Sequence, residues 1–529
     1  MKRLIIAMVI LLACALIIGC GTTATPTKPT TPAAPAPTSK PTATPTEQPQ
    51  RGGVLKIILT SYPADFVTQT ETTTPIQCTV SLPVWDPLLS LDKMGNWAPS
   101  LATNVDISAD LKALTFTLRK GVKFHDGTDF NAAAVKYHID NAKMRSSYTS
   151  IVSMDIIDTY TIRFNLSQYD ATFVYNMATG SGQVNSMTAI QKPTTPENLR
   201  KDHIAGTGPF RYVDWKRDVG LRTVRNDGYW DTGKPYLDGI EFIYMSDSVS
   251  AQIAFEAGEA QVFRGVTPET ATALRAKGYN VDYIEENGYL LVGDGGNADS
   301  PFADKRVRLA VEYALDRNAL VNGFGYGFSK PLTQVCPPNI PSGVNPALQP
   351  RPYDPAKSKQ LLADAGYPNG FDTLLIAQTS DDKNLLTAIQ SYLRAVGIRA
   401  TMDIADPARF SNLGTKGWNN GLMFWGTPAN LSYATTMKTT FTSLTTRYHS
   451  QFIPPGIEQA ITQACAEPDS SKRLQIVQNV VKTLYDEAVA VPVMTKPSIF
   501  VMAKSVHGCN FTTLCSTLVW TPADAWLSK

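Results

Sequence analysis

The chain has 529 residues, of which 43% are hydrophobic and 18% are charged, so it is long enough for two to four globular domains. Its 8 Trp, 21 Tyr and 20 Phe supply ample core material, which excludes disorder over the whole length. Without Lys2 and Arg3 the basic and acidic residues balance at 46 each, which gives no electrostatic basis for binding nucleic acid.

The N-terminus contains the one segment that is apolar enough to enter a bilayer. Lys2 and Arg3 precede an uncharged run of 15 residues, Leu4–Ile18. A spanning helix needs about 20 apolar residues, so this run predicts a signal peptide over residues 1–19, and a polytopic membrane protein is excluded. A plain secretory peptide and an uncleaved anchor remain as alternatives.

The run ends in Ile17-Ile18-Gly19-Cys20, which looks like a bacterial lipobox. In that motif small or branched residues fit the signal peptidase, and the cysteine thiol takes a diacylglyceryl group. We therefore predict lipidation at Cys20 and an extracytoplasmic protein anchored to the cytoplasmic membrane, in a periplasm or on the outer cell surface. Leu11-Leu12-Ala13-Cys14 is a second candidate, but cleavage there leaves a short apolar run before it.

A linker of low complexity follows the lipobox. Residues 21–50 contain 10 Thr, 8 Pro and 5 Ala, and no aromatic residue occurs before Tyr62. Such a segment cannot bury enough apolar surface to offset its chain entropy. Proline favours extended conformers of about 3 Å per residue, so residues 20–50 form a tether that reaches roughly 90 Å from the lipid.

From Arg51 onward strand-like and helix-like patterns alternate, which predicts α/β domains. The strand-like runs are rich in β-branched and aromatic residues and lie at Val54–Leu59, Leu114–Arg119, Thr161–Leu166, Ile240–Met245, Tyr289–Val292, Thr373–Ala377, Ile398–Ile404, Leu422–Trp425 and Ile499–Met502. Helices are predicted over Val307–Leu315, from Pro355 (after the N-cap Asp354) to just before Gly366, and over Asn384–Val396.

Sequence motifs of catalysis are missing. The five histidines are not paired at a metal-ligand spacing, and neither HExxH nor GxSxG occurs. Gly228–Lys234 matches most of a phosphate-binding loop, but Pro235 follows where that loop needs Ser or Thr. Five cysteines remain after Cys14 and Cys20, and no pair has the CxxC spacing of a zinc or thioredoxin-like site. We predict no catalytic residue, no metal site and no cofactor; a secreted cell-surface hydrolase remains the alternative.

Five stretches carry a family resemblance, namely Leu114–Tyr137 with its turn His125-Asp126-Gly127, Gly206–Tyr212 with Arg225–Trp230, Phe255–Gln261, Pro301–Arg317 and Tyr353–Gly366. In this order and spacing they resemble the extracytoplasmic solute-binding proteins of the oligopeptide/dipeptide/nickel class, bacterial solute-binding protein family 5. The resemblance covers about residues 52–525. The stretches also have structural interpretations, in which His125 is a turn residue and Arg306 and Arg308 form a solvated face.

The resemblance implies a two-lobed periplasmic-binding-protein-like α/β fold with a hinge and a cleft. An extra α+β subdomain, residues 89–203, would be inserted in the first lobe. The first lobe would combine residues 51–88, 204–288 and 498–529, and the second lobe would be residues 289–497. The hinge crossings would lie near Tyr289–Gly296 and Pro492–Pro497, where Gly293, Gly295 and Gly296 would absorb rotation.

The implied function is transport across a membrane without chemistry on the solute. A monomer would capture a peptide-like or other small solute in the cleft and deliver it to the permease subunits of an ABC transporter. A second possibility within the resemblance is a peptide-class scaffold that binds a non-peptide ligand such as an oligosaccharide.

The ligand residues depart from the family pattern at one position. Peptide-binding members commonly carry a Trp followed three residues on by an Asp, which neutralises the ligand's ammonium group. Here Trp425 is followed by Pro428, and no acid occurs from there to Lys438. Asp65, Asp403 or Asp406 would have to replace the missing acid. We predict ligand contacts, with core packing as the alternative for the aromatic residues, at Tyr62, Asp65, Tyr289, Trp418, Trp425 and Tyr433.

Overall fold

The computed structural model describes residues 48–61, 75–91, 97–141, 148–170, 173–192, 204–216, 218–428, 432–445, 447–511 and 520–529. Pro49–Lys529 forms one compact unit. The predicted site residues Cys20, Tyr62 and Asp65 lie outside the described residues. Within those ranges no helix is long and apolar enough to cross a membrane.

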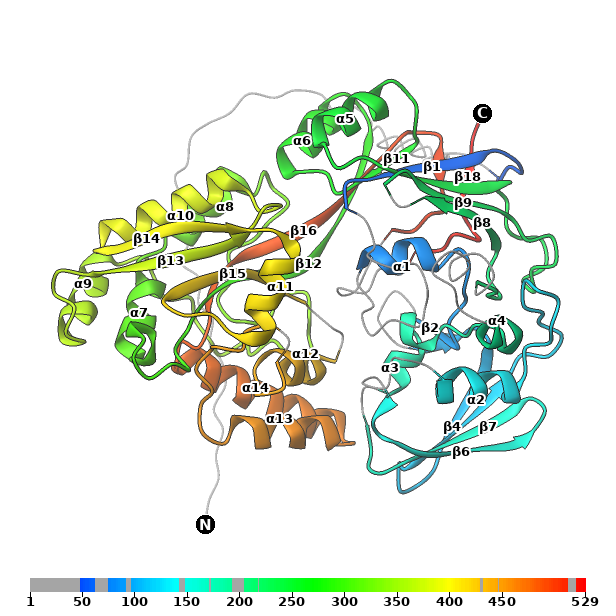
Figure 1. Cartoon of the computed structure of the whole chain (residues 1–529), viewed down its shortest axis with the longest axis horizontal. Helices are drawn as coiled ribbons and strands as arrows, with labels where there is room; N and C mark the ends of the chain where they lie inside the picture. The colour runs from blue at the N-terminus through cyan, green and yellow to red at the C-terminus, as the bar shows by residue number, and fades with distance from the viewer. Residues whose placement is uncertain are drawn as a thin grey trace, which may run out of the picture. The chain divides into compact units, whose positions relative to one another are not determined.

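A ten-stranded mixed sheet runs through the unit in the order β14-β13-β15-β12-β16-β11-β1-β10-β9-β8 (Figure 1). Its strands are β1 (Val54–Leu59), β8 (Phe210–Lys216), β9 (Gly220–Arg225), β10 (Gly239–Tyr244), β11 (Val262–Arg264), β12 (Asn280–Gly293), β13 (Phe371–Gln378), β14 (Ile398–Ala405), β15 (Gly421–Pro428) and β16 (Val491–Met502). Seven of them contain runs that the sequence predicts as strands, but β12 and β16 are far longer than predicted.

The two long antiparallel strands β12 and β16 connect the two halves of the sheet. β11 pairs with β16 as far as Phe500, and β15 pairs with β12 from Asn287 onward. The crossing is therefore residues 283–286 of β12 and 497–499 of β16. The β12–β16 pairing is irregular between Glu285 and Asn287 and again just after the crossing. Since bulges bend a strand and increase its twist, the crossing is suited to bending.

The crossing lies earlier in β12 than expected, and the three glycines assigned to hinge rotation serve close packing. A Cβ atom on Gly293 would lie 2.5 Å from the ring of Phe302, and one on Gly295 would lie 2.5 Å from the Phe302 carbonyl oxygen. One on Gly296 would lie 2.7 Å from the carbonyl oxygen of Gln451. These glycines allow a neighbouring segment to approach the backbone closely, and their role in hinge rotation stays a prediction.

The parallel strands of both halves direct their carboxyl ends toward the crossing. In one half β1 is parallel to β10 and β11, and in the other β13 is parallel to β14 and β15. β11 and β12 are both antiparallel to β16, whereas β15 is antiparallel to β12. The two parallel groups therefore run in opposite directions, and their carboxyl ends face each other.

Helices cover both faces of the half that contains β13, β14 and β15. One face carries α7 (Lys305–Tyr313), α8 (Arg317–Phe324), α9 (Pro355–Asp364) and α10 (Lys383–Ala395), packed on Leu291, Leu375 and Phe424. The other carries α11 (Pro407–Lys416), α12 (Tyr433–Thr440), α13 (Ile457–Ala466) and α14 (Ser470–Asp486), packed on Leu290, Ile376 and Met423. The start of α9 follows the sequence prediction, because Asp354 accepts the Lys357 amide at 2.9 Å.

The other half carries α1 (Pro75–Ser81), α5 (Ser248–Glu256) and α6 (Pro268–Ala276). A separate four-stranded sheet has the order β4-β5-β7-β6, with β4 (Ala102–Ile107), β5 (Ala113–Leu118), β6 (Ile151–Asp158) and β7 (Thr161–Leu166). With α2 (Ala132–Asn141) and α3 (Phe173–Met177) it encloses its own core around Phe116, Phe130 and Phe164. The remaining short elements are α4 (Met187–Gln191), β2 (Leu89–Leu91), β3 (Trp97–Pro99), β17 (Val506–His507), β18 (Trp526–Leu527) and the 3-10 turns Gly180–Gly182 and Pro301–Ala303.

The motif turn at His125 is a scaffold contact. The His125 amide donates to the Gly206 carbonyl at 2.8 Å, and Nε2 lies 2.9 Å from the Gly208 carbonyl oxygen. Asp86 accepts from the Trp230 indole at 2.8 Å and from the Tyr229 hydroxyl at 3.1 Å. The recognised stretches are therefore held together by turns and buried hydrogen bonds, as the structural interpretation of His125 requires.

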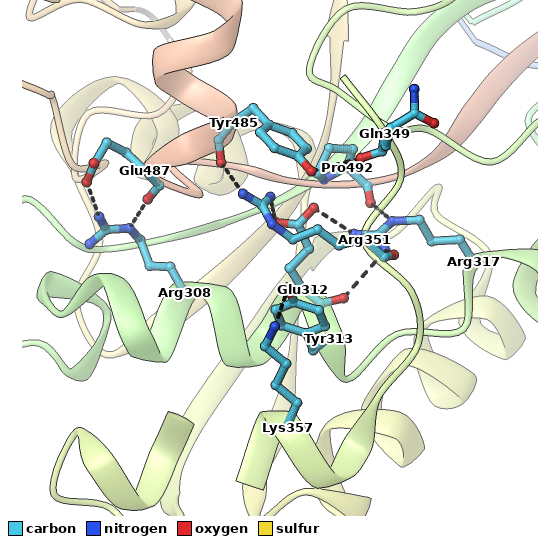
Figure 2. Close-up of polar contacts among 10 residues, drawn as sticks. All are labelled: Arg308, Glu312, Tyr313, Arg317, Gln349, Arg351, Lys357, Tyr485, Glu487 and Pro492. Carbon is cyan, nitrogen blue, oxygen red and sulfur yellow. Dashed lines mark hydrogen bonds and ion pairs between the residues drawn. The ribbon is translucent and has the colours of Figure 1, made fainter. Parts of the chain in front are cut away.

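Figure 2 shows a buried charge network that begins on α7. The Arg308 side chain is only 3% exposed and donates to the carbonyl oxygens of Phe302, Ala303 and Glu487. Its predicted place on a solvated face is therefore wrong, whereas Arg306 is exposed as expected. The sequence spacing cannot reveal this difference, because the carbonyl acceptors come from a neighbouring turn and from the end of α14.

Candidate functional site

The candidate ligand site is the edge where the carboxyl ends of the two strand groups face each other across the crossing. In α/β sheets ligands bind outside the carboxyl ends of parallel strands, at the point where strand order reverses. On this edge Asp382 caps the start of α10 after β13, and Asp406 caps α11 after β14. Trp425 lies near the end of β15, beside the segment of β12 that leaves the crossing.

Trp425 is half-buried, and two aromatic side chains pack against its ring. Its ring centre lies 4.8 Å from that of Phe410 and 5.9 Å from that of Tyr448, both nearly perpendicular. A Cβ atom on Gly414 would lie 2.4 Å from the Trp425 ring, so only glycine allows α11 to approach this closely. The indole is thereby held in one orientation at the edge of the sheet.

Arg447 covers one face of the same ring. Its guanidinium carbon lies 4.6 Å from the Trp425 ring centre, and Nη1 donates to the Gly426 carbonyl at 3.1 Å. No carboxylate in the part of the chain that the structure describes forms an ion pair with it. Burial lowers the pKa of Arg447, because desolvation disfavours the charged form of the guanidinium. Sequence reasoning missed this residue, because no motif or periodicity connects it to Trp425.

Tyr289 lies at the same edge but on the opposite face of the sheet. Leu290 is the register partner of Trp425, so the neighbouring Tyr289 points the other way and stacks on Phe424 with ring centres 4.5 Å apart. The ammonium nitrogen of Lys496 lies 5.1 Å from the Tyr289 ring centre. Burial raises the pKa of the Tyr289 hydroxyl, and the charge of Lys496 opposes this shift. The aromatic residues proposed from the sequence thus belong to two faces.

Trp418 and Tyr433 both belong to the core on the face of the sheet that carries α11, α12, α13 and α14. Trp418 is 3% exposed and donates from Nε1 to the Gly421 carbonyl at 2.9 Å. Tyr433 is fully buried, and its hydroxyl finds no partner among the described residues. It borders a cavity of about 430 Å³ lined by Tyr175, Pro341, Ser342, Ser432, Tyr433, Ala434, Ser470, Ser471, Arg473, Leu474 and Val477. Contact of these two aromatics with a ligand stays a prediction, as does that of Tyr62 and Asp65.

Two of the acids proposed as substitutes for the missing aspartate already have partners. Both oxygens of Asp403 accept from Arg409 at 2.6 Å, and this pair lowers the pKa of Asp403. Asp406 accepts the amides of Ala408 and Arg409 at 3.0 Å as the N-cap of α11. A further acid, Asp381, is buried and accepts the Gln378 amide at 2.9 Å, so sequence reasoning missed a third engaged carboxylate at this edge.

Residues 96–448 match the family model described as bacterial extracellular solute-binding proteins, family 5 Middle. The chain belongs to this family. This match confirms the predicted class, an extracytoplasmic solute-binding protein of family 5. Among the described residues no group of three or more His, Cys, Asp or Glu is placed to hold a metal ion.

One relative is the glutathione-binding protein GsiB of Salmonella choleraesuis (strain SC-B67), which is 34% identical over 332 residues. That alignment covers 60% of this chain and 63% of GsiB, so the match spans less than two thirds of the relative's length. GsiB of Shigella flexneri serotype 5b (strain 8401) is 29% identical over 449 residues, and the alignment covers 80% of the present chain and 85% of that GsiB.

The fold is similar to that of DppA, a periplasmic binding protein from Helicobacter pylori solved with the peptide STSA. The TM-score is 0.78 at 23% identity, over 91% of this chain and 99% of DppA. These values show a shared architecture, the predicted two-lobed periplasmic-binding-protein fold.

Proposed function

We propose that this family 5 protein captures a small solute between its two lobes and delivers it to the permease of an ABC importer. The observation that carries the proposal is the meeting of the carboxyl ends of both strand groups at a crossing made by β12 and β16. Bending at the irregular β12–β16 pairing would close the lobes over the solute, as in other hinge-closing binding proteins. No bond in the solute is made or broken.

The proposed lobes follow the division expected from the sequence. The first lobe is residues 51–88, 204–288 and 498–529, the inserted subdomain is residues 89–203, and the second lobe is residues 289–497. Separate cores support this division, since one cluster is built around Phe116 and Phe164 and another around Leu291 and Phe424. A lipid on Cys20 and the linker that follows would keep the lobes near the permease at the membrane surface.

The solute is proposed to be peptide-like or another small molecule without a free ammonium at the Trp425 end. GsiB is named for glutathione and the DppA structure contains a peptide, which supports the peptide class. Pro428 stands where peptide-binding members commonly carry an acid, and Asp403 and Asp406 are engaged elsewhere. Burying an unpaired ammonium there would cost several kcal/mol, so neutral, blocked or sugar-like ends are favoured.

A thermal-shift screen tests the function. The purified full chain is heated with peptides, oligosaccharides and metal chelates, and a solute at 100 times its dissociation constant should add about 2.7 kcal/mol to the free energy of unfolding. Stabilisation without turnover supports the proposal. Conversion of the stabilising compound into a product would favour a hydrolase instead, and a screen in which nothing stabilises the protein would contradict solute binding.

A further inference from the structure

We propose that Arg447, stacked on Trp425, binds a carboxylate group of the solute. This inference rests on the proposed function, because it names the chemistry that the interlobe site recognises. The contacts of Arg447, its charge balance and its position beside the carboxyl end of β15 support it.

Most hydrogen-bond donors of the Arg447 guanidinium have no acceptor among the described residues. A guanidinium carries five N–H donors arranged in a plane, and this one uses a single described acceptor, the Gly426 carbonyl. Its guanidinium carbon lies over the Trp425 ring, so the donors that do not reach Gly426 are the ones open to a solute. A carboxylate accepts two parallel hydrogen bonds from the edge of a guanidinium plane, so stacking orients the group for bidentate recognition.

Among the described residues, no carboxylate pairs with the charge of Arg447. Figure 2 shows how other buried arginines of this lobe are satisfied, since Arg317 and Arg351 both pair with Glu312 and also reach backbone carbonyls. Around Arg447 the described ring contacts are neutral, and residues 428–437 contain no Asp or Glu. Asp403 is already paired with Arg409. A half-buried cation with no counter-ion in the described part of the chain favours a ligand that brings the negative charge.

Arg447 lies where a solute bound at the crossing would meet it. Its acceptor Gly426 is the register partner of Tyr289, at the carboxyl end of β15. A single guanidinium matches the charge and planar shape of one carboxylate, whereas a phosphate dianion would need a second cation on the same face. Lys496 does not supply it, because it lies over Tyr289 on the opposite face.

A matched panel tests the proposal. Acetylated amino acids, acetylated di- and tripeptides and sugar acids are each offered to the full chain as the carboxylate and as the carboxamide, by thermal shift and calorimetry. We expect a carboxylate member to bind at least about tenfold more tightly than its amide. Arg447→Gln should remove this preference, and Arg447→Lys should retain part of it. Arg399→Gln removes an equal charge from an exposed surface pair with Asp372 and should leave the preference unchanged.

Each outcome decides the question. Equal affinity for carboxylates and amides, or an Arg447→Gln variant that keeps the preference, would overturn the carboxylate site while solute binding stands. The same holds if neutral solutes bind and no carboxylate stabilises the protein at about 10 mM. If no compound of any class binds, the proposed function itself fails. The comparison of carboxylate with amide uses the unaltered protein, so it remains decisive even if a variant does not fold.

Discussion

Glu312 offers the sharpest test of what holds the second lobe together. Its carboxylate is 2% exposed and pairs with Arg317 at 3.2 Å and with Arg351 at 2.5 Å (Figure 2). Arg317 also donates to the Pro492 carbonyl on β16 at 2.6 Å, and Arg351 stacks on Tyr485. Glu312 therefore neutralises two guanidiniums that connect helices α7, α8 and α14 to the long strand.

We expect Glu312→Gln to lower the free energy of unfolding by about 3–5 kcal/mol. Glutamine keeps the shape, but it removes the charge and turns one acceptor oxygen into an NH₂ group that faces a donor. The control is Asp372→Asn, which removes a carboxylate that is 79% exposed and paired with Arg399. That change should cost no more than about 1 kcal/mol, because water and salt screen an exposed pair.

Urea unfolding followed by tryptophan fluorescence measures both variants, because Trp418 and Trp425 lie in the affected lobe. Raising the ionic strength to about 1 M shortens the screening length to about 3 Å, which should erase the effect of the control but not that of Glu312→Gln. If Glu312→Gln costs no more than Asp372→Asn, the buried pairing does not stabilise the lobe and the reasoning from desolvation is wrong.

Three further predictions concern acid stability, anchoring and the ligand. His138 is 2% exposed, and burial lowers its pKa from 6.5 to about 4. The unfolded chain takes up the proton first as pH falls, so about 3 kcal/mol of stability present above pH 6.5 should be lost by pH 4. Melting curves across this range, compared with those of His138→Gln, check the sign, and a wild-type melting temperature that rises on acidification would contradict it. Cys20→Ala should release the protein from the membrane fraction, and a variant that stays membrane-bound with its leader removed would refute lipidation. A peptide with a free amino terminus should bind more weakly than its acetylated form by calorimetry; the opposite preference would indicate a substitute acid, to be sought among Asp65, Asp403 and Asp406 by single Asn replacements.

Local signals in the sequence sufficed for many elements of the fold. Val54–Leu59 and Thr161–Leu166 are strands with the predicted bounds, and α9 begins at the Asp354–Pro355 cap as expected. Such signals act within a few residues, through alternation of side chains along a strand and through a cap that satisfies the first amides of a helix. The order of the recognised stretches likewise identified the family without any knowledge of contacts.

The long strands and the candidate site depended on tertiary structure. The sequence does not predict the full length of β12 and β16, because these strands contain residues that usually interrupt a strand, namely Gly288, Pro492 and Pro497. Each strand continues through them because its partner pairs with it in an irregular register. Leu290 pairs with Trp425, and successive residues of a strand point to opposite faces, so Tyr289 lies on the other face of the sheet. Arg447 meets Trp425 where α11 packs against both, since a Cβ atom on Gly414 would lie 2.4 Å from the Trp425 ring and 2.7 Å from the Arg447 carbonyl oxygen. Periodicity reports which face of its own element a residue occupies, but not which distant segment the fold brings against that face.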